Sequence, residues 1–442
     1  MNPQHTGEYP YSVYPPLNYK WTYKLVHNDF LMISASISSN GVIYVGDGGR
    51  FLRAIDIESG KILWKKGLTA NVWTTSLIND TLLLAGTSIS FDTTMATLFL
   101  LNAKRGDSIW GIPLFTVEFQ PVPVDTFIYV SNLQGVMYGI KNRGKIIWRD
   151  TIYAEAWPYA GGGAIIDDYL FAGADESPFL SLNRYTGEEI CKFDPSGWID
   201  NRFPLVKYPT NIYFFASETL YCVNKNLTEI LWRKNEFGKF ILPTPSLYDT
   251  WLLCTRFGTI YKLHADTGDE IWKIHPVDSG GTTSITITEN KIFWAAGDNL
   301  YSIDLQNGDT LFRTKYTDKY IPWLNSWFWP IFYGPYVIAA HYKKMYIYKG
   351  TEFNMSQNDE FFIFYPSLIR SEGYLFLNLL SSSYVKLEVL DVSGRLREII
   401  NLGRLEKGKH FYVFKPKNLS NGIYFIKWKG ERKKFIFLKI GS

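Results

Sequence analysis

The amino-acid sequence predicts an all-β protein, in which an eight-bladed β-propeller closed by an N-terminal strand is followed by a small, Ig-like β-sandwich. Three observations lead to this fold class. Aromatic residues make up 17% of the 442-residue chain, and large rings favour pleated, half-buried surfaces. A unit of about 42 residues recurs along most of the chain. The last part of the chain changes to a different series of short alternating strands.

The best-formed unit is GVIYVGDGGRFLRAIDIESGKILW, residues 41–64. It contains three apolar or alternating runs separated by two glycine-rich turns, at 47–49 and 58–60. Glycine adopts positive φ at little steric cost, so both turns are typical of tight hairpins. The unit therefore predicts consecutive antiparallel strands.

The outer strand of each unit ends in a large residue, which makes the repeat easy to follow. These residues are Trp64, Trp110, Trp148, Cys191, Trp232, Trp272 and Phe312, at intervals of 46, 38, 43, 41, 40 and 40 residues. A turn glycine stands four residues earlier in most units, but the fifth has Thr228, so we expect a looser turn there. Eight apolar strands can be counted in the series, and about four strands per unit is typical of a propeller blade.

The tryptophans have a structural interpretation. A blade cannot bury both faces of its sheet alone, and a ring placed between blades removes a large apolar area from water. Gly60 is expected to let the hairpin turn sharply enough to aim the ring at its neighbour. The residues assigned to blade docking are Trp21, Asp56, Gly60, Trp64, Trp110, Trp148, Trp232, Trp272 and Phe312.

The N-terminus is expected to close the ring. The eighth unit, residues 336–350, has two strands but no outer strand after them. Trp21 precedes Trp64 by 43 residues, one period. We therefore expect residues 18–26 to supply the outermost strand of the eighth blade, which removes an exposed sheet edge.

Domain boundaries follow from these patterns. Residues 1–350 are expected to form the propeller, the polar stretch 351–360 a linker, and residues 361–442 the sandwich. Alternating apolar residues over 385–389 and 424–428 indicate strands with one buried face. About seven short strands are expected in this domain.

Charge and composition restrict the partners. The net charge of +4 divides into +9 for residues 385–442 and −5 for the rest. The basic residues alternate with apolar ones, which favours a solvated sheet face over a nucleic-acid surface. No run of 18 apolar residues occurs, so no membrane-spanning helix is expected. We expect a monomer that binds no nucleic acid.

The unit resembles the repeat of PQQ-type (quinoprotein-like) eight-bladed propellers through Ala54, Asp56, Ser59, Gly60 and Trp64. Residues 2–25 are similar to the segment that often opens secreted members of this superfamily, just after a signal peptide. The resemblance implies the fold, but this fold carries many unrelated functions.

The quinoprotein alcohol dehydrogenases of this superfamily typically have an adjacent Cys-Cys pair, a metal site of Glu, Asn and Asp, and an Asp base. Here Cys191, Cys222 and Cys254 are far apart in sequence, and buried free thiols are expected. No residues show metal-ligand spacing. We therefore expect no PQQ, no calcium and no enzymatic activity.

The tail resembles the C-terminal sorting domain of the type IX secretion system. The residues that carry this resemblance are Tyr365-Pro366, Val389-Leu390-Asp391-Val392-Ser393-Gly394-Arg395, Gly408-Lys409-His410, Ser420-Asn421-Gly422-Ile423-Tyr424-Phe425 and Lys439. Ser367-Leu368 depart from the pattern, and flagellar-hook-capping-like modules share the same sandwich. The resemblance implies contact with secretion machinery and export to the cell surface or medium, with the periplasm as the alternative. It also implies a signal peptide upstream of residue 1.

A ligand is expected at the loops that lead into the innermost strands, because they surround the central channel. The candidates are Trp73, Glu118, Glu155, Trp157, Arg202, Lys239, Asp278 and Trp323. Aromatic rings beside scattered charges suit a peptide or a glycan, whereas the alternative is that the rings only fill the channel. We therefore expect a non-catalytic, exported protein- or glycan-binding propeller. The alternatives are a PQQ-dependent oxidoreductase and an envelope-assembly scaffold.

Overall fold

A computed structural model shows an all-β chain that divides into two compact units, Met1–Thr351 and Glu352–Ser442. The residues that the structure describes are 8–9, 13–24, 35–88, 96–117, 119–152, 163–173, 178–195, 205–207, 211–216, 218–235, 237, 245–256, 258–276, 285–288, 291–315, 330–341, 344–350, 360–365, 368–369 and 373–438. Within these ranges, no helix is long and apolar enough to cross a membrane. The sequence-predicted linker lies almost wholly outside them.

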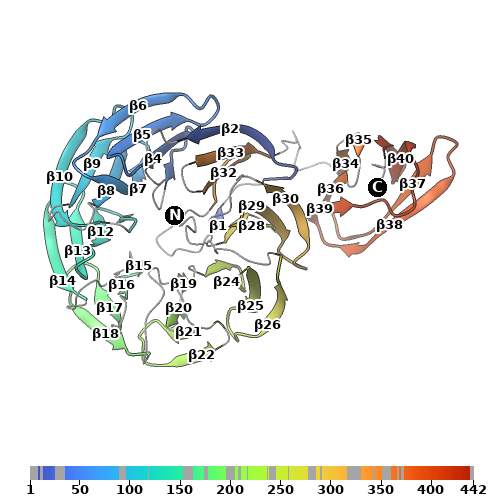
Figure 1. The fold of residues 1–442 in the computed structure, drawn as a ribbon. Coiled ribbons are helices and arrows are strands. Elements are labelled where there is room, and N and C mark those ends of the chain that lie inside the picture. The colour runs from blue at the N-terminus through green and yellow to red at the C-terminus, as the bar shows by residue number, and fades with distance from the viewer. Residues whose placement is uncertain are drawn as a thin grey trace. The chain divides into compact units, whose positions relative to one another are not determined.

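The described residues of the first unit form eight sheets arranged around a central axis, as Figure 1 shows, and each contains four antiparallel strands. Blades 1–4 are β3 (Ser36–Ile37), β4 (Val42–Gly46), β5 (Phe51–Asp56) and β6 (Ile62–Gly67); β7 (Asn71–Asn79), β8 (Leu82–Ser88), β9 (Ala96–Asn102) and β10 (Ser108–Phe115); β11 (Val122–Val124), β12 (Phe127–Ser131), β13 (Val136–Lys141) and β14 (Ile146–Thr151); β15 (Ala164–Ile166), β16 (Tyr169–Ala172), β17 (Phe179–Asn183) and β18 (Glu189–Phe193).

The remaining blades repeat this order, and the sheet count is consistent with the eight blades that the sequence predicts. Blades 5–8 are β19 (Leu205–Lys207), β20 (Asn211–Ala216), β21 (Thr219–Asn224) and β22 (Ile230–Lys234); β23 (Ser246–Tyr248), β24 (Trp251–Arg256), β25 (Thr259–His264) and β26 (Glu270–Ile274); β27 (Thr286–Thr288), β28 (Lys291–Ala296), β29 (Asn299–Asp304) and β30 (Thr310–Lys315); β31 (Ile331–Tyr333), β32 (Tyr336–His341), β33 (Lys344–Lys349) and β2 (Asn18–Lys24).

The second and third strands of each blade hold the core. The sequence VIYVG of β4, for example, is buried at every position, because both faces of a blade are covered by its neighbours. The outer strands instead alternate between half-buried and exposed side chains, as in β22 and β26. Each apolar cluster joins two adjacent sheets, so the blades depend on one another for burial.

The predicted closure is confirmed. Strand β2 pairs antiparallel with β33, from Asn18 opposite Lys349 to Lys24 opposite Lys344. The chain before it is also fixed, since Val13 and Leu17 are buried in a cluster with Phe293 and Tyr348 from blades 7 and 8. The N-terminal strand β2 and the last strands of the propeller, β31–β33, therefore belong to one sheet.

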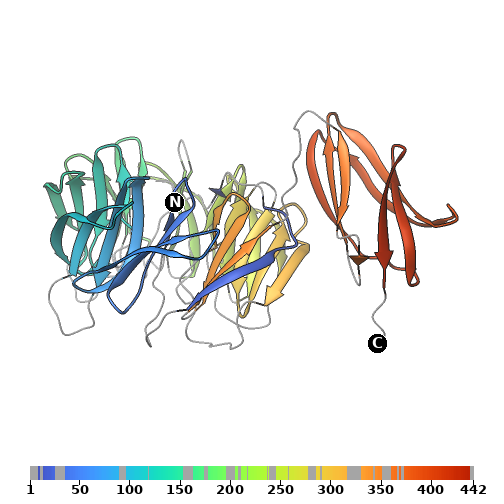
Figure 2. The same cartoon turned by 90° about the horizontal axis from the view of Figure 1, so that it is seen from above.

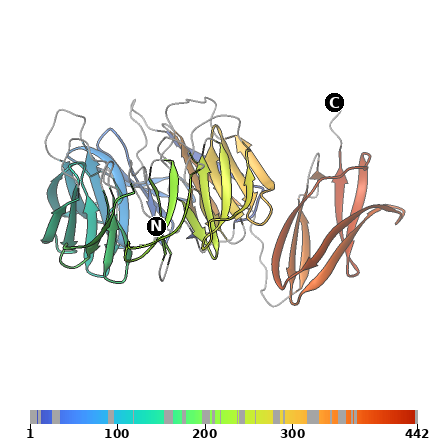
Figure 3. The same ribbon diagram turned by 90° about the horizontal axis from the view of Figure 1, so that it is seen from below.

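The N-terminus contributes a second strand that the sequence does not predict. Strand β1 (Glu8–Tyr9) pairs in parallel with β27, the innermost strand of blade 7. Blade 7 therefore has five strands in the order β1-β27-β28-β29-β30. Figure 1 shows β1 on the inner side of this blade, and Figures 2 and 3 show the ring of sheets from its edges.

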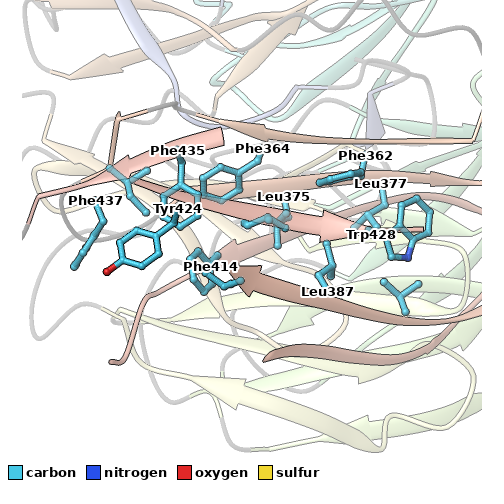
Figure 4. Packing of buried hydrophobic residues seen from close by; sticks show 14 of the residues in the cluster. Phe362, Phe364, Leu375, Leu377, Leu387, Phe414, Tyr424, Trp428, Phe435 and Phe437 are labelled. Atoms are coloured by element: carbon cyan, nitrogen blue, oxygen red, sulfur yellow. The ribbon is translucent and has the colours of Figure 1, made fainter. Parts of the chain in front are cut away.

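The second unit is a sandwich of two sheets, with eight strands rather than the seven or so expected. One sheet contains β34 (Phe361–Tyr365), β36 (Gly373–Leu379) and β39 (Gly408–Phe414); the other contains β35 (Leu368–Ile369), β41 (Glu431–Phe437), β40 (Gly422–Trp428), β37 (Ser383–Asp391) and β38 (Leu396–Leu405). Figure 4 shows the aromatic core between them, with Phe364 and Phe435 at a centroid distance of 4.9 Å.

Candidate functional site

The repeat residues form the contacts between blades. The indole nitrogen of each outer-strand tryptophan donates to a backbone carbonyl in the turn of the next blade at 2.8–2.9 Å. The pairs are Trp21–Ile57, Trp64–Ala103, Trp110–Asn142, Trp148–Arg184, Trp232–Ala265 and Trp272–Gln306. Phe312 packs against the cluster that joins blades 7 and 8.

The turn glycine has a role beyond the expected one. Gly60 lies in the tight turn at positive φ, and Trp21 of the preceding blade packs against it. A Cβ on Gly60 would lie 3.0 Å from that indole, and one on Gly187 would lie 2.6 Å from Trp148. Both glycines have positive φ, so a side chain there would be strained as well as crowded.

Asp56 stabilises the turn between β5 and β6. Its Oδ1 accepts hydrogen bonds from the backbone nitrogen and hydroxyl of Ser59, at 2.8 and 2.5 Å. The backbone nitrogen of Gly60 donates to the Asp56 carbonyl at 2.9 Å. The geometry gives Asp56 a local role in turn formation.

The junction between blades 4 and 5 has neither the tryptophan nor the glycine. Cys191 occupies the tryptophan position, and the facing turn has Leu227 at a φ of 57°. The side chain of Leu227 is 4% exposed and belongs to the cluster that Cys191 borders. The hydrogen bonding of this turn differs from that of the glycine turns: the backbone nitrogen of Leu227 donates to the Asn224 carbonyl, and that of Thr228 donates to Oδ1 of Asn224, both at 3.0 Å. Cys191 thus stands where other junctions have tryptophan, and Leu227, one residue before Thr228 at the glycine position, is buried in the same cluster.

This exchange predicts coupling between the two positions. Cys191→Trp alone is expected to overpack the junction and to lower the free energy of unfolding by about 1–3 kcal/mol. In the Leu227→Gly background the same change should cost less, because glycine leaves room for the indole. Urea unfolding of both single variants and the double variant measures the coupling energy. Strict additivity would contradict the assigned packing.

Among the predicted ligand residues, the structure places only Trp73, which lies on β7 of blade 2. Glu118, Glu155, Trp157, Arg202, Lys239, Asp278 and Trp323 lie outside the described residues. Trp73 is next to an irregularity of pairing between Val72 and Thr74. Its indole nitrogen is buried and has no hydrogen-bond partner.

The innermost strands are joined by polar side chains that the sequence analysis missed. The Ser246 hydroxyl of blade 6 donates to the Ile285 carbonyl before β27, and the Thr286 hydroxyl of blade 7 donates to the Pro330 carbonyl before β31, both at 2.6 Å. Gln120 donates from Nε2 to the Thr75 carbonyl of blade 2 at 3.1 Å. These bonds connect neighbouring blades at or beside their innermost strands. In blades 6 and 7 the hydroxyl residue of the innermost strand pairs with the third residue of the next strand, Ser246 with Leu253 and Thr286 with Phe293. A serine or threonine shortly before each apolar strand could therefore have indicated these bonds.

Two polar atoms near this wall are buried without partners. They are the indole nitrogen of Trp73, a donor, and Oε1 of Gln120, an acceptor. An unpartnered buried polar group costs free energy, so such atoms favour a bound polar group.

A metal ion needs a set of ligands gathered at one place. Among the described residues, no three His, Cys, Asp or Glu side chains gather where a metal ion could be held. The three cysteines lie on separate strands, Cys191 on β18, Cys222 on β21 and Cys254 on β24, and none of them forms a disulfide. Burial raises the pKa of the Cys254 thiol, which keeps it protonated.

The sequence motifs of the second unit form turns in the structure. Asp391 is the last residue of β37, and its Oδ1 accepts from the backbone nitrogens of Ser393 and Arg395 at 2.9 and 3.0 Å. Its Oδ2 accepts from Nε of Arg397 at 2.9 Å. Tyr424 donates its hydroxyl to the Ser420 carbonyl at 2.9 Å. These contacts give the motif residues structural roles, whatever else they do.

A pH dependence follows for this unit. Desolvation acts to raise the pKa of Asp391, but hydrogen bonds from Arg395 and Arg397 outweigh it and hold this pKa below its ordinary value. The ionised Asp391 carboxylate therefore contributes fully to the stability of this unit above its unfolded pKa of about 3.9. This contribution is lost as the pH falls through the lower pKa of the folded state. Asp391→Asn should flatten the acid side of the stability curve. Thermal unfolding between about pH 2 and 6 checks this, and an unchanged curve would contradict it.

Comparison with known proteins identifies relatives of the propeller. The family described as outer membrane protein assembly factor BamB matches residues 21–111 and 216–351. BamB from Moraxella catarrhalis superposes with a TM-score of 0.59 at 14% identity, over 75% of this chain and 99% of that chain. The computationally designed Ika8 protein gives a TM-score of 0.61 at 13% identity, over 74% of this chain and 98% of that chain. These two similarities concern the fold.

A curated relative is an enzyme. The tetrathionate hydrolase of Acidithiobacillus ferrooxidans is 24% identical over 198 residues, which are 44% of this chain. The matched segment spans only 35% of the length of that enzyme.

Proposed function

Because the chain belongs to the family of the outer membrane protein assembly factor BamB, we propose that it is an exported, non-catalytic propeller that binds another protein in the cell envelope or at the cell surface. The observation that carries the proposal is the use of the repeat residues. Tryptophan, aspartate and glycine of the repeat are all engaged in turns and blade contacts. Binding is thereby assigned to the channel wall and the loops around it.

Protein is favoured over glycan as the ligand for two reasons. The family is named for a role in the assembly of outer membrane proteins, and the innermost strand of blade 7 pairs with an additional strand. Strand addition is a common way of binding an extended peptide, since main-chain hydrogen bonds supply affinity. A glycan-binding propeller is the alternative.

The test of this function is a binding experiment with purified full-length chain. Envelope proteins cross-linked to it should be competed by excess unlabelled chain, and the affinity should survive removal of glycans from the extract. Binding to a glycan panel without any protein partner would favour the alternative. Turnover of an alcohol or sugar in the presence of PQQ and calcium, followed by dye reduction, would instead make the protein an oxidoreductase.

We further propose that the second unit directs export through a type IX secretion system. The support is the sequence resemblance of its turn motifs, around Asp391 and Tyr424. In a host that has this system, the full chain should reach the surface or the medium, and a chain that ends at residue 351 should accumulate in the periplasm. Equal distribution of the two chains would contradict the sorting role and leave the binding role intact.

A further inference from the structure

The inner edge of blade 7 carries a peptide strand. Strand β1 lies parallel to β27, with Glu8 opposite Ile287 and Tyr9 opposite Thr288. Among the innermost strands of the described blades, β27 is alone in having a second partner, because the others end their sheets. The edge of β27 is thus able to form main-chain hydrogen bonds with an extended segment.

The receiving edge is held in place by the structure around it. Ile287 is fully buried and belongs to the cluster of blade 7. The Thr286 hydroxyl fixes β27 to blade 8 through Pro330. The Thr288 hydroxyl is buried and has no hydrogen-bond partner among the residues that the structure describes. A rigid edge loses little conformational entropy when a strand is added.

The β1 segment is attached to a strong anchor. Val13 and Leu17 are buried between blades 7 and 8, and a Cβ on Gly350 would lie 2.8 Å from the side chain of Val13. Three residues separate Tyr9 from this anchor. A tether of that length gives β1 a local concentration on the order of millimolar at the edge of β27.

The pairing itself is short. Two residues of β1 are paired, and each net main-chain hydrogen bond contributes about 0.5–1.5 kcal/mol. Tethering, more than intrinsic affinity, therefore keeps β1 in place. A longer extended segment that makes more hydrogen bonds along the channel can displace it.

We propose that the channel edge of β27 is a peptide-docking site, that Glu8–Tyr9 fill it in cis, and that an extended segment of a partner protein fills it in trans. The inference rests on the proposed protein-binding function and names the site and the form of the ligand. It makes the N-terminal segment an internal competitor that sets the threshold for partner binding.

The test uses a fluorescent synthetic peptide with the sequence of residues 3–12 and the full-length chain. Glu8→Pro with Tyr9→Pro removes two backbone donors and should prevent cis pairing. Glu8→Ala with Tyr9→Ala keeps both donors and is the matched control. Fluorescence anisotropy should show binding to the proline variant that is at least about tenfold tighter than binding to the alanine variant or the unchanged chain.

A second peptide, N-methylated at the positions of Glu8 and Tyr9, should not bind the proline variant, since it lacks the same donors. Equal affinity of the first peptide for all three chains, or no binding to a folded proline variant, would overturn the proposal. If the proline variant does not fold, a chain that begins at residue 13 keeps the anchor and β2 and takes its place. If the peptide does not bind but the cross-linking experiment identifies a protein partner, the docking site at β27 is wrong and the proposed protein-binding function stands.

Discussion

Replacing Trp148 with alanine is expected to lower the free energy of unfolding of the propeller by about 3–5 kcal/mol, the usual range for removal of a buried large aromatic side chain. The side chain is 7% exposed. Its indole nitrogen donates to the Arg184 carbonyl at 2.9 Å, and its ring covers Gly187 of the next blade. The change removes the ring, the hydrogen bond and the contact between blades 3 and 4.

Chemical denaturation followed by intrinsic fluorescence measures this loss. Ile147→Ala is the matched control, because Ile147 is the adjacent residue of the same outer strand and is 41% exposed. It should cost within about 0.5 kcal/mol, as surface substitutions usually do. A loss at Trp148 no larger than that at Ile147 would show that the tryptophans do not hold the blades together.

Removing the closing strand is expected to have the larger effect. A chain that lacks residues 1–24 loses β2 and the buried residues Val13 and Leu17, and it exposes the free edge of β33. Trp21, which lies on Gly60 and donates to the Ile57 carbonyl, is lost as well. Loss of the contacts of Trp21 alone should lower the free energy of unfolding by several kcal/mol, on the order of 3. The open ring should therefore unfold at a much lower temperature and associate through its exposed edge.

Calorimetry and size-exclusion chromatography of the shortened chain test this result. Tyr19→Ala in the full chain is the control, because Tyr19 is on the same strand but 58% exposed, and it should leave the chain monomeric and nearly as stable. Adding a synthetic peptide of residues 13–26 should recover part of the lost stability. A shortened chain with unchanged stability would show that closure depends on other contacts.

The repeat explains why the ring could be predicted from sequence alone. Most units have a large aromatic residue at intervals of about 40 residues, with a glycine four residues earlier. These residues form strands and turns within a single unit, so the pattern is visible in the sequence of each unit. The placing of Trp21 one period before Trp64 extends the same pattern to the N-terminus, and β2 confirms it. The sequence did not show that each ring packs against the turn glycine of the following blade. This contact joins two units, so it could be seen only in the structure.

The features that could not be predicted depend on contacts between distant segments. Glu8–Tyr9 form a strand of two residues, which has no periodicity to detect, and the pairing with β27 joins segments almost 280 residues apart. The replacement of tryptophan by Cys191 is explained only by Leu227 on the next blade. Gln120 and Thr75 likewise belong to different blades, so a reading of single units does not bring them together.

The N-terminal segment belongs to the propeller at two places, in blade 8 through β2 and at the inner edge of blade 7 through β1. Amide hydrogen exchange of the unchanged chain and of the Glu8→Pro, Tyr9→Pro variant tests this double attachment. The variant should lose protection in the peptide that contains Thr286–Thr288 and keep it in the peptide that contains Lys344–Lys349. Unchanged protection over Thr286–Thr288 would contradict the pairing of β1 with the channel edge.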